Sequence, residues 1–201
     1  MEIDMQKVEE LIIKIISFLQ GTSFGASKTK IYKLMYFLDF GNYATTGSSV
    51  TQLPYLKFKF GPVPLGIHTL LEAMEENDLL RIKKVSDYYG SHLIYEIQEA
   101  ANEYFKFDWQ EQELSTINKT LVYFKDFSAS QISKESHHQY AWVCAKNAKI
   151  ISYEDAKFAD YEWLDYYYDK SKENFQEDQK TRQMLNESDE IDELMASIQK
   201  L

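Results

Sequence analysis

The sequence has little cysteine and no long uninterrupted apolar run. Its single cysteine, Cys144, excludes a disulfide within the chain and favours a reducing compartment. The most apolar stretch, Leu11–Leu19, is interrupted by Lys14 and is too short to span a bilayer. No basic segment leads into an apolar run at the N-terminus, as a secretion signal requires. We therefore expect a cytoplasmic protein with no membrane association.

Basic residues are scarce relative to acidic ones. The chain has 22 lysines and arginines against 32 aspartates and glutamates, which gives a formal net charge of −10. This charge repels nucleic acid and favours a protein partner with a basic face. Hydrophobic residues make up 44% of the chain and aromatic residues 15%, too much apolar surface for a disordered polypeptide. The chain therefore has the composition of a folded binding protein.

The periodicity predicts a mainly α fold of the α+β class, in which a compact helical domain carries a small antiparallel sheet. Apolar residues at helical spacing predict helices at about residues 8–19, 27–44, 65–77, 114–124, after Ser130, 140–148 and 154–168. Leu56, Phe58 and Phe60 alternate with lysines and predict a half-buried strand. We expect a stiff turn at Gly61–Pro64 and a β-hairpin over residues 80–97.

The composition divides the chain at about residue 170. Residues 171–188 are polar, which is typical of a linker. The residues that follow restore helical periodicity, with an apolar stripe formed by Ile191, Leu194, Met195, Ile198 and Leu201. We therefore expect a domain over residues 1–170, followed over residues 171–201 by an acidic linker and an amphipathic C-terminal helix.

Three short motifs follow one another along the chain. The first is Lys33–Phe40 with Thr46–Gly47 behind it, the second is Phe60–Pro64, and the third is Ser136–Trp142. In this order and spacing the chain resembles the SocA-like antitoxins that carry the Panacea domain. The residues that carry the resemblance are Lys33, Leu34, Tyr36, Gly47, Gly61, Pro62, Val63, Ser136, His137, Ala141 and Trp142.

The resemblance implies an antitoxin that neutralises a toxin, usually encoded beside it, by binding it directly. Such antitoxins pair with unrelated toxins, so the resemblance does not identify the partner. The third motif departs from the family pattern: His138 and Gln139 stand where acidic residues are usual, and Val143 stands where a lysine is common.

Aromatic side chains near the end of the domain are candidates for binding the toxin. Tyr161, Trp163 and Tyr167 lie on a segment that, as a helix, would expose some of its rings, and exposed Tyr and Trp anchor interfaces. The alternative is that these rings pack on the N-terminal helices. The apolar stripe of residues 191–201 has to dock on its own domain, on a second copy of the chain or in a groove of the toxin.

No pattern predicts catalysis, a cofactor or a metal ion. Nucleophile-elbow, phosphate-loop and zinc-protease motifs are absent, and His137 and His138 point in different directions on a helix. We expect Ser136 to cap the helix that contains Trp142, His137 to bond a neighbouring loop, and Trp142 to lie in the core. Cys144 is expected to be a buried, inert thiol because it lies in an apolar run.

Two other functions stay open. A helix–loop–helix around Gly21 and the hairpin at 80–97 also match a winged-helix fragment of a DNA-binding regulator. In that case Lys28, Lys30 and Lys33 would lie on the recognition helix, whereas the simpler interpretation is a solvated face. A phage-derived inhibitor of a host protein would share the binding chemistry of an antitoxin.

Overall fold

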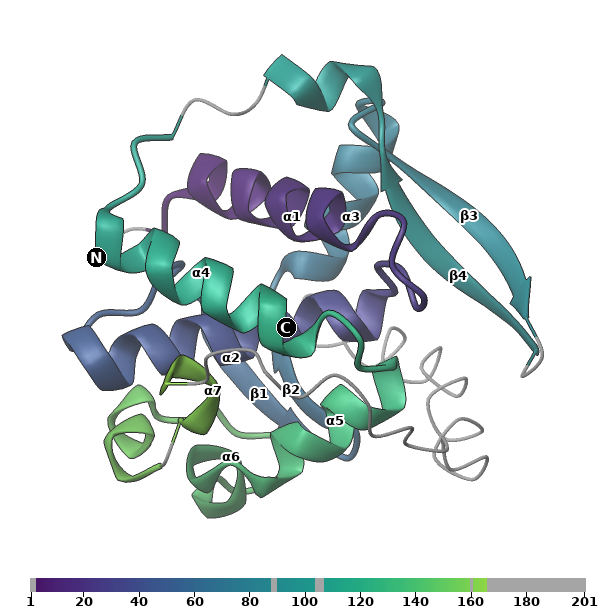
Figure 1. Ribbon diagram of the computed structural model, residues 1–201. Coiled ribbons are helices and arrows are strands. Elements are labelled where there is room, and N and C mark those ends of the chain that lie inside the picture. Colours follow the sequence, from purple (N-terminus) through teal and green to yellow (C-terminus); the bar gives the residue numbers. More distant parts are fainter. Residues whose placement is uncertain (1–2, 88–89, 104–106, 160, 166–201) are drawn as a thin grey trace.

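The computed structural model describes residues 3–87, 90–103, 107–159 and 161–165. Helices surround one central helix, and two separate antiparallel hairpins complete the fold (Figure 1). The elements are α1 Met5–Leu19, α2 Lys28–Thr46, β1 Tyr55–Phe58, β2 Gly61–Pro64, α3 Ile67–Glu76, β3 Leu80–Asp87, β4 Gly90–Ile97, η1 Glu99–Glu103, α4 Glu111–Phe124, α5 Ala129–His138, α6 Tyr140–Cys144, η2 Tyr153–Phe158 and α7 Glu162–Asp165. The predicted mainly α, α+β class is confirmed, and residues 171–201 lie outside the described residues.

The central helix is α2, which is buried along most of its length. Every residue from Lys30 to Asn42 is buried, and the helix packs against α1, α4, α5, β2 and η2. The Ser27 side chain caps its N-terminus, and Gly47 ends it with a φ of 76°, where a residue without a Cβ is favoured. The helix predicted over residues 27–44 is therefore confirmed, and other elements cover it on both sides.

Helix α1 lies over the core with a wide buried face. Asp4 caps its first turn by accepting a hydrogen bond from the amide of Lys7. Glu10, which the periodicity places off the buried stripe, is buried as well. Its carboxylate accepts hydrogen bonds from the amide of Phe107 and from Nε1 of Trp109, both at 2.8 Å, because the segment before α4 crosses over it.

The Gly61–Pro64 segment is a strand rather than the predicted turn. It forms β2, which pairs with β1 in the register Leu56↔Val63, and the chain reverses at Lys59 and Phe60. β1 pairs on its other side with the segment around Ile150, so β2 is at the edge of the sheet. An edge strand tolerates prolines because one row of its amide groups has no partner strand.

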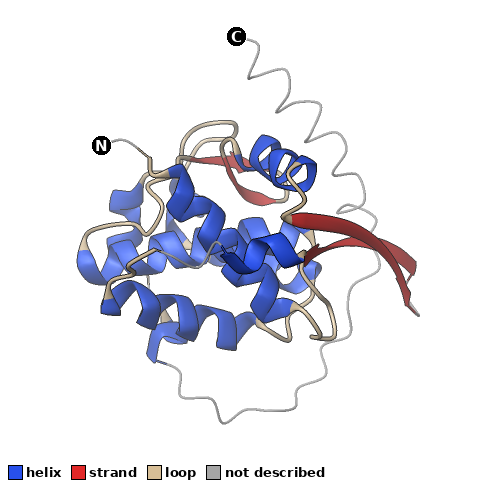
Figure 2. Cartoon of the chain, turned by 90° about the horizontal axis from the view of Figure 1, so that it is seen from above, coloured by secondary structure: helices blue, strands red, loops and turns tan. Residues whose placement is uncertain are grey.

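The predicted hairpin over residues 80–97 is confirmed as β3 and β4. It projects from the helical body as a two-stranded arm (Figures 1 and 2). The arm is attached at its base, where the amide of Tyr95 donates to the carbonyl of Ala26 at 2.9 Å. Arg81 and Lys83 both pair with Glu96 across the arm.

The last two predicted helices are shorter than expected. The helix predicted over 140–148 stops at Cys144, because the chain turns away at Ala148 (φ 54°) to pair with β1. The segment predicted as one helix over 154–168 begins as the 3₁₀ helix η2 and restarts as α7.

Among the described residues, no helix is both long and apolar enough to cross a bilayer.

Leu34→Ala should lower the free energy of unfolding by about 2–5 kcal/mol, because Leu34 is fully buried in α2 and the substitution leaves a cavity. Leu93→Ala is the matched control: Leu93 lies on the hairpin arm and is 55% exposed, so its loss should cost less than about 1 kcal/mol. Urea denaturation measures both. Equal losses would contradict the assignment of Leu34 to the core.

Candidate functional site

The three sequence motifs meet at one point, where α2, β2 and α5 touch. Lys33 Nζ, from α2, donates a hydrogen bond to the carbonyl of Pro62 in β2 at 3.0 Å. A Cβ on Gly61 would lie 2.5 Å from Ser136 Oγ, on α5, and 2.7 Å from Lys33 Cε. Gly61 also has a φ of 99°, so both its contacts and its backbone require glycine. We call Lys33, Gly61, Pro62 and Ser136 the motif junction.

Serines of α5 extend the motif junction toward β1. Ser136 Oγ donates to the carbonyl of Ser133 at 2.6 Å, and Ser133 Oγ donates to the carbonyl of Phe60 at 2.8 Å. The prediction that Ser136 caps the helix of Trp142 is wrong, since Ser136 lies inside α5. Ser128 caps α5, in a reciprocal capping box with Gln131.

A stack of two rings and one ammonium group lies beside the motif junction. The rings of His137 and Trp142 are 4.3 Å apart and nearly parallel, and Lys57 Nζ lies 4.1 Å from the Trp142 ring centroid. Lys57 Nζ also donates to the carbonyls of Val143, at 3.2 Å, and Ala145, at 2.9 Å. These bonds satisfy carbonyl groups at the end of α6. Trp142 is half-buried rather than fully in the core.

Electrostatics keep His137 neutral. Burial, and after it the electrostatic influence of Lys33, His138 and Lys57, lowers the pKa of His137 to about 4, although a hydrogen bond with the backbone of Phe60 favours the charged form. That bond agrees with the prediction that His137 bonds a neighbouring segment. A neutral imidazole stacks on Trp142 without adding a further positive charge beside Lys57.

Two lysines expected at the surface are buried. Lys30 is fully buried, and its Nζ donates to the carbonyl of Lys125 at 2.7 Å. Lys33 is 2% exposed, and burial lowers the pKa of each of the two ammonium groups to about 7. Neither a DNA-recognition helix nor a solvated face describes these positions, so the winged-helix interpretation loses its basic surface.

The first motif also carries a buried carboxylate, Asp39. Its oxygens accept hydrogen bonds from the amide of Thr51 at 2.7 Å, from the Thr51 hydroxyl and from the Tyr55 hydroxyl at 2.6 Å. Burial raises the pKa of Asp39 to about 6 in spite of these donors. Of the other motif residues, Leu34, Tyr36, Val63 and Ala141 are buried, and Gly47 ends α2.

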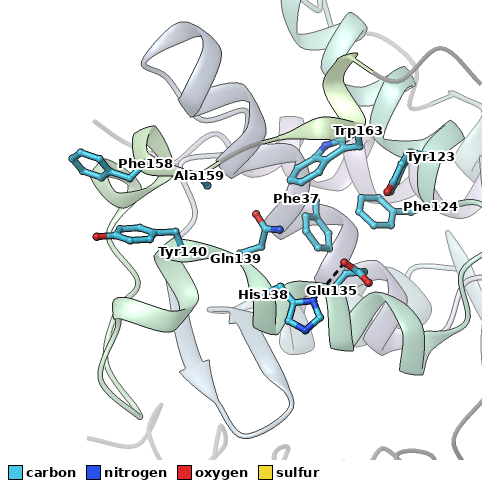
Figure 3. Close-up of a pocket in the computed structure, with 10 residues that line it drawn as sticks. All are labelled: Phe37, Tyr123, Phe124, Glu135, His138, Gln139, Tyr140, Phe158, Ala159 and Trp163. Carbon is cyan, nitrogen blue, oxygen red and sulfur yellow. Dashed lines mark ion pairs between the residues drawn. The ribbon is translucent and has the colours of Figure 1, made fainter.

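A pocket of about 330 Å³ opens next to the C-terminal end of α5 (Figure 3). Phe37 and Phe124 stack with their ring centroids 4.4 Å apart, and Trp163 meets Phe37 edge-on at 5.0 Å. The residues that line the pocket are Phe37, Tyr123, Phe124, Glu135, His138, Gln139, Tyr140, Phe158, Ala159 and Trp163. The wall is thus mostly aromatic, and α5 and the start of α6 supply its polar groups.

Exposed apolar side chains lie on α6 and η2. Phe158 is 70% exposed, Val143 56% and Tyr140 45%, and the rings of Tyr140 and Phe158 are 5.7 Å apart. We call these three residues the α6–η2 face. The sequence does not reveal this face, because Phe158, Tyr140 and Val143 lie on two segments predicted as longer helices, and helical spacing alone does not show that these three side chains face solvent. Cys144 also contradicts its prediction, since it is exposed.

The residues selected for partner binding have a mixed outcome. Tyr161 is 8% exposed and Trp163 4%, so for these two rings the structure agrees with the alternative of packing inside the domain. Both pack on the core, since the first helix turn of α7 lies against α4. The other selected residues lie outside the described residues: Tyr167, Ile191, Leu194, Met195 and Ile198.

In the described part of the chain, no group of three or more His, Cys, Asp and Glu side chains is placed to hold a metal ion.

Gly61→Ala should destabilise the protein more than Gly47→Ala does. Both glycines have positive φ angles, but an added Cβ clashes at Gly61 and meets nothing within 4 Å at Gly47. Left-handed backbone alone costs an alanine about 1–2 kcal/mol, and the contact with Ser136 and Lys33 adds to this at Gly61 only. Thermal and urea denaturation measure the difference. Equal losses would mean that the three motifs do not touch at Gly61.

The free energy of unfolding should rise between about pH 7 and pH 9. Lys33 has a pKa of about 7 in the folded protein and the ordinary value near 10.5 when unfolded. The unfolded chain therefore binds more protons in this range, and raising the pH favours folding by up to about 1.4 kcal/mol per pH unit. In Lys33→Met the slope should be smaller by up to that amount, whereas Lys84→Met, at an exposed position of the arm, should keep it. An unchanged slope in Lys33→Met would contradict the burial of a titrating ammonium.

The three motifs that meet at the motif junction all lie within one known protein family domain. The family model described as antitoxin SocA-like, Panacea domain, matches residues 31–143, which is more than half of the chain. The match begins in α2 and ends in α6, so it includes the whole motif junction. No curated protein and no solved structure matches the chain. The chain belongs to the SocA-like antitoxin family with the Panacea domain.

Proposed function

We propose that this protein is a cytoplasmic antitoxin that neutralises its cognate toxin by direct binding, without catalysis. The observation that carries the proposal is the α6–η2 face: three large apolar side chains are exposed on two elements that pack against each other. Exposed apolar and aromatic groups that cluster in this way are typical of protein interfaces.

The backbone that carries the α6–η2 face is held by contacts with the rest of the domain. α6 packs against α5 and η2, and Lys57 holds the carbonyls at its end. Tyr140 and Val143 are therefore displayed by backbone that does not have to be ordered on binding. Preorganised side chains lose less conformational entropy in a complex, so a small number of them can dominate the affinity.

The charge of the chain selects the kind of partner. A net charge of −10 favours a toxin with a basic surface, as a protein that acts on nucleic acid would present. Tyr161 and Trp163 are buried, so they would stabilise the domain beneath the interface rather than contact the toxin with exposed rings. Tyr167 and the stripe Ile191, Leu194, Met195 and Ile198 remain proposed contacts, on the toxin or on a second copy of the chain.

Phe158→Ser should abolish neutralisation without unfolding the protein. Phe158 is 70% exposed, so its loss costs little stability, whereas removing an aromatic anchor from an interface weakens binding by about 2 kcal/mol or more, roughly 30-fold. The measurement is growth of cells that express the protein encoded by the adjacent reading frame together with wild-type or variant antitoxin.

The matched control is Leu93→Ser, which removes a similarly exposed apolar side chain from the hairpin arm. It should rescue growth as the wild type does. Loss of rescue by Leu93→Ser with full rescue by Phe158→Ser would move the interface from the α6–η2 face to the arm. No rescue by the wild type would contradict the antitoxin function itself.

A further inference from the structure

The pocket beside the α6–η2 face has the chemistry of a receptor for a flat cation. Its deep wall is formed by Phe37, Phe124 and Trp163, whose ring centroids lie 4.4–5.8 Å apart. Tyr140 and Phe158 stand at its exposed rim (Figure 3). The π-faces of aromatic rings carry partial negative charge and attract cations, most strongly the planar guanidinium group.

Glu135 and Gln139 each bring a hydrogen-bond acceptor to the pocket. Glu135 contributes a half-exposed carboxylate, 3.8 Å from Nδ1 of His138. Oε1 of Gln139 is buried and accepts no hydrogen bond from any described residue. Figure 3 shows the Gln139 amide directed toward Phe37, inside the ring of lining residues. A buried acceptor without a donor costs free energy, and a ligand that brings an N–H group removes that cost.

From this arrangement we propose that the pocket binds the side chain of an arginine presented by the toxin. The guanidinium group would stack on the aromatic wall and donate N–H bonds to the Glu135 carboxylate and to Gln139 Oε1. Lysine fits less well, because its compact ammonium group is strongly hydrated and cannot stack as a plane. That the arginine belongs to a toxin rests on the proposed function.

Size and charge agree with a single basic side chain. A volume of about 330 Å³ is at the lower end of the range for ligand pockets, about 300–1,000 Å³, and is small for a nucleotide or another large cofactor. The net charge of −10 draws basic partners toward the molecule from a distance. Around the bound side chain, Tyr140 and Phe158 would exclude water, as apolar groups around an interface anchor do.

The test uses N-acetyl-arginine methylamide as probe, and N-acetyl-citrulline methylamide, which has the same shape without the charge, as its control. The full chain labelled with ¹⁵N is titrated with each and followed by NMR, with the indole N–H of Trp163 assigned through Trp163→Phe. We expect the arginine probe to shift the Trp163 signal with millimolar affinity and the citrulline probe to bind at least about tenfold more weakly.

Glu135→Gln should lower the affinity for the arginine probe by about tenfold as well. Glu72 is an exposed carboxylate on α3 outside the pocket lining, so Glu72→Gln should leave that affinity unchanged. Equal binding of both probes, or full affinity in Glu135→Gln, would overturn the arginine assignment. The chain also has an arginine of its own in the segment after the domain, Arg182. If Arg182→Gln bound the probe more tightly than the wild type, Arg182 would be the residue that occupies the pocket, and the proposal that a toxin supplies the arginine would be overturned.

The rescue assay separates this inference from the proposed function. Wild-type rescue of growth with no shift by the arginine probe would leave the antitoxin function standing and overturn the pocket assignment. Probe binding without any rescue would leave a guanidinium pocket standing and overturn the toxin as its partner. Rescue that is lost in Glu135→Gln and kept in Glu72→Gln supports both.

Discussion

A buried ammonium group constrains the architecture around it. Lys33 gives up most of its hydration inside α2, and the carbonyl of Pro62 replaces only part of what water supplied. That bond requires β2 to lie against α2, and β2 can approach only because Gly61 has no side chain in the space taken by Ser136. The positions of β2 and α5 on the central helix thus depend on one another, and moving β2 away from α2 would leave the buried ammonium of Lys33 without the carbonyl of Pro62.

The orientation of the exposed surface follows from this interior arrangement. Because Ser133 and His137 both bond the backbone of Phe60, the last turns of α5 are fixed relative to the β1–β2 hairpin. The chain leaves α5 at Gln139 and enters α6, whose end is held by Lys57. A buried polar network therefore determines where Tyr140 and Val143 point, although neither side chain belongs to that network.

Local periodicity was sufficient for the long elements and insufficient for the segments shaped by tertiary contacts. α1, α2 and the hairpin arm follow directly from their apolar spacing. The Gly61–Pro64 strand was predicted as a turn, because prolines are tolerated in a sheet only on an edge strand. Which strand lies at the edge depends on tertiary pairing, which local sequence does not show. Lysine, by its charge, predicts exposure, so burial of Lys30 and Lys33 could not be read from the sequence. The exposure of Phe158 and Cys144 was missed for another reason: each is the last residue of its helical segment, and both segments were predicted to continue further.

The boundary of the family match divides the pocket into two parts. Phe37, Glu135 and Gln139 belong to the matched residues 31–143, whereas Phe158 and Trp163 come from the segment beyond them. Antitoxins of one family that bind unrelated toxins need a constant scaffold and a part that can change. A pocket whose acceptors lie on the scaffold and whose aromatic side is completed by Phe158 of η2 and Trp163 of α7 meets both needs, because neither Phe158 nor Trp163 belongs to the motif junction. On this argument Glu135 and Gln139 would determine that the bound group is a cation rich in N–H donors, whereas Phe158 and Trp163 would determine the shape of the cavity around it.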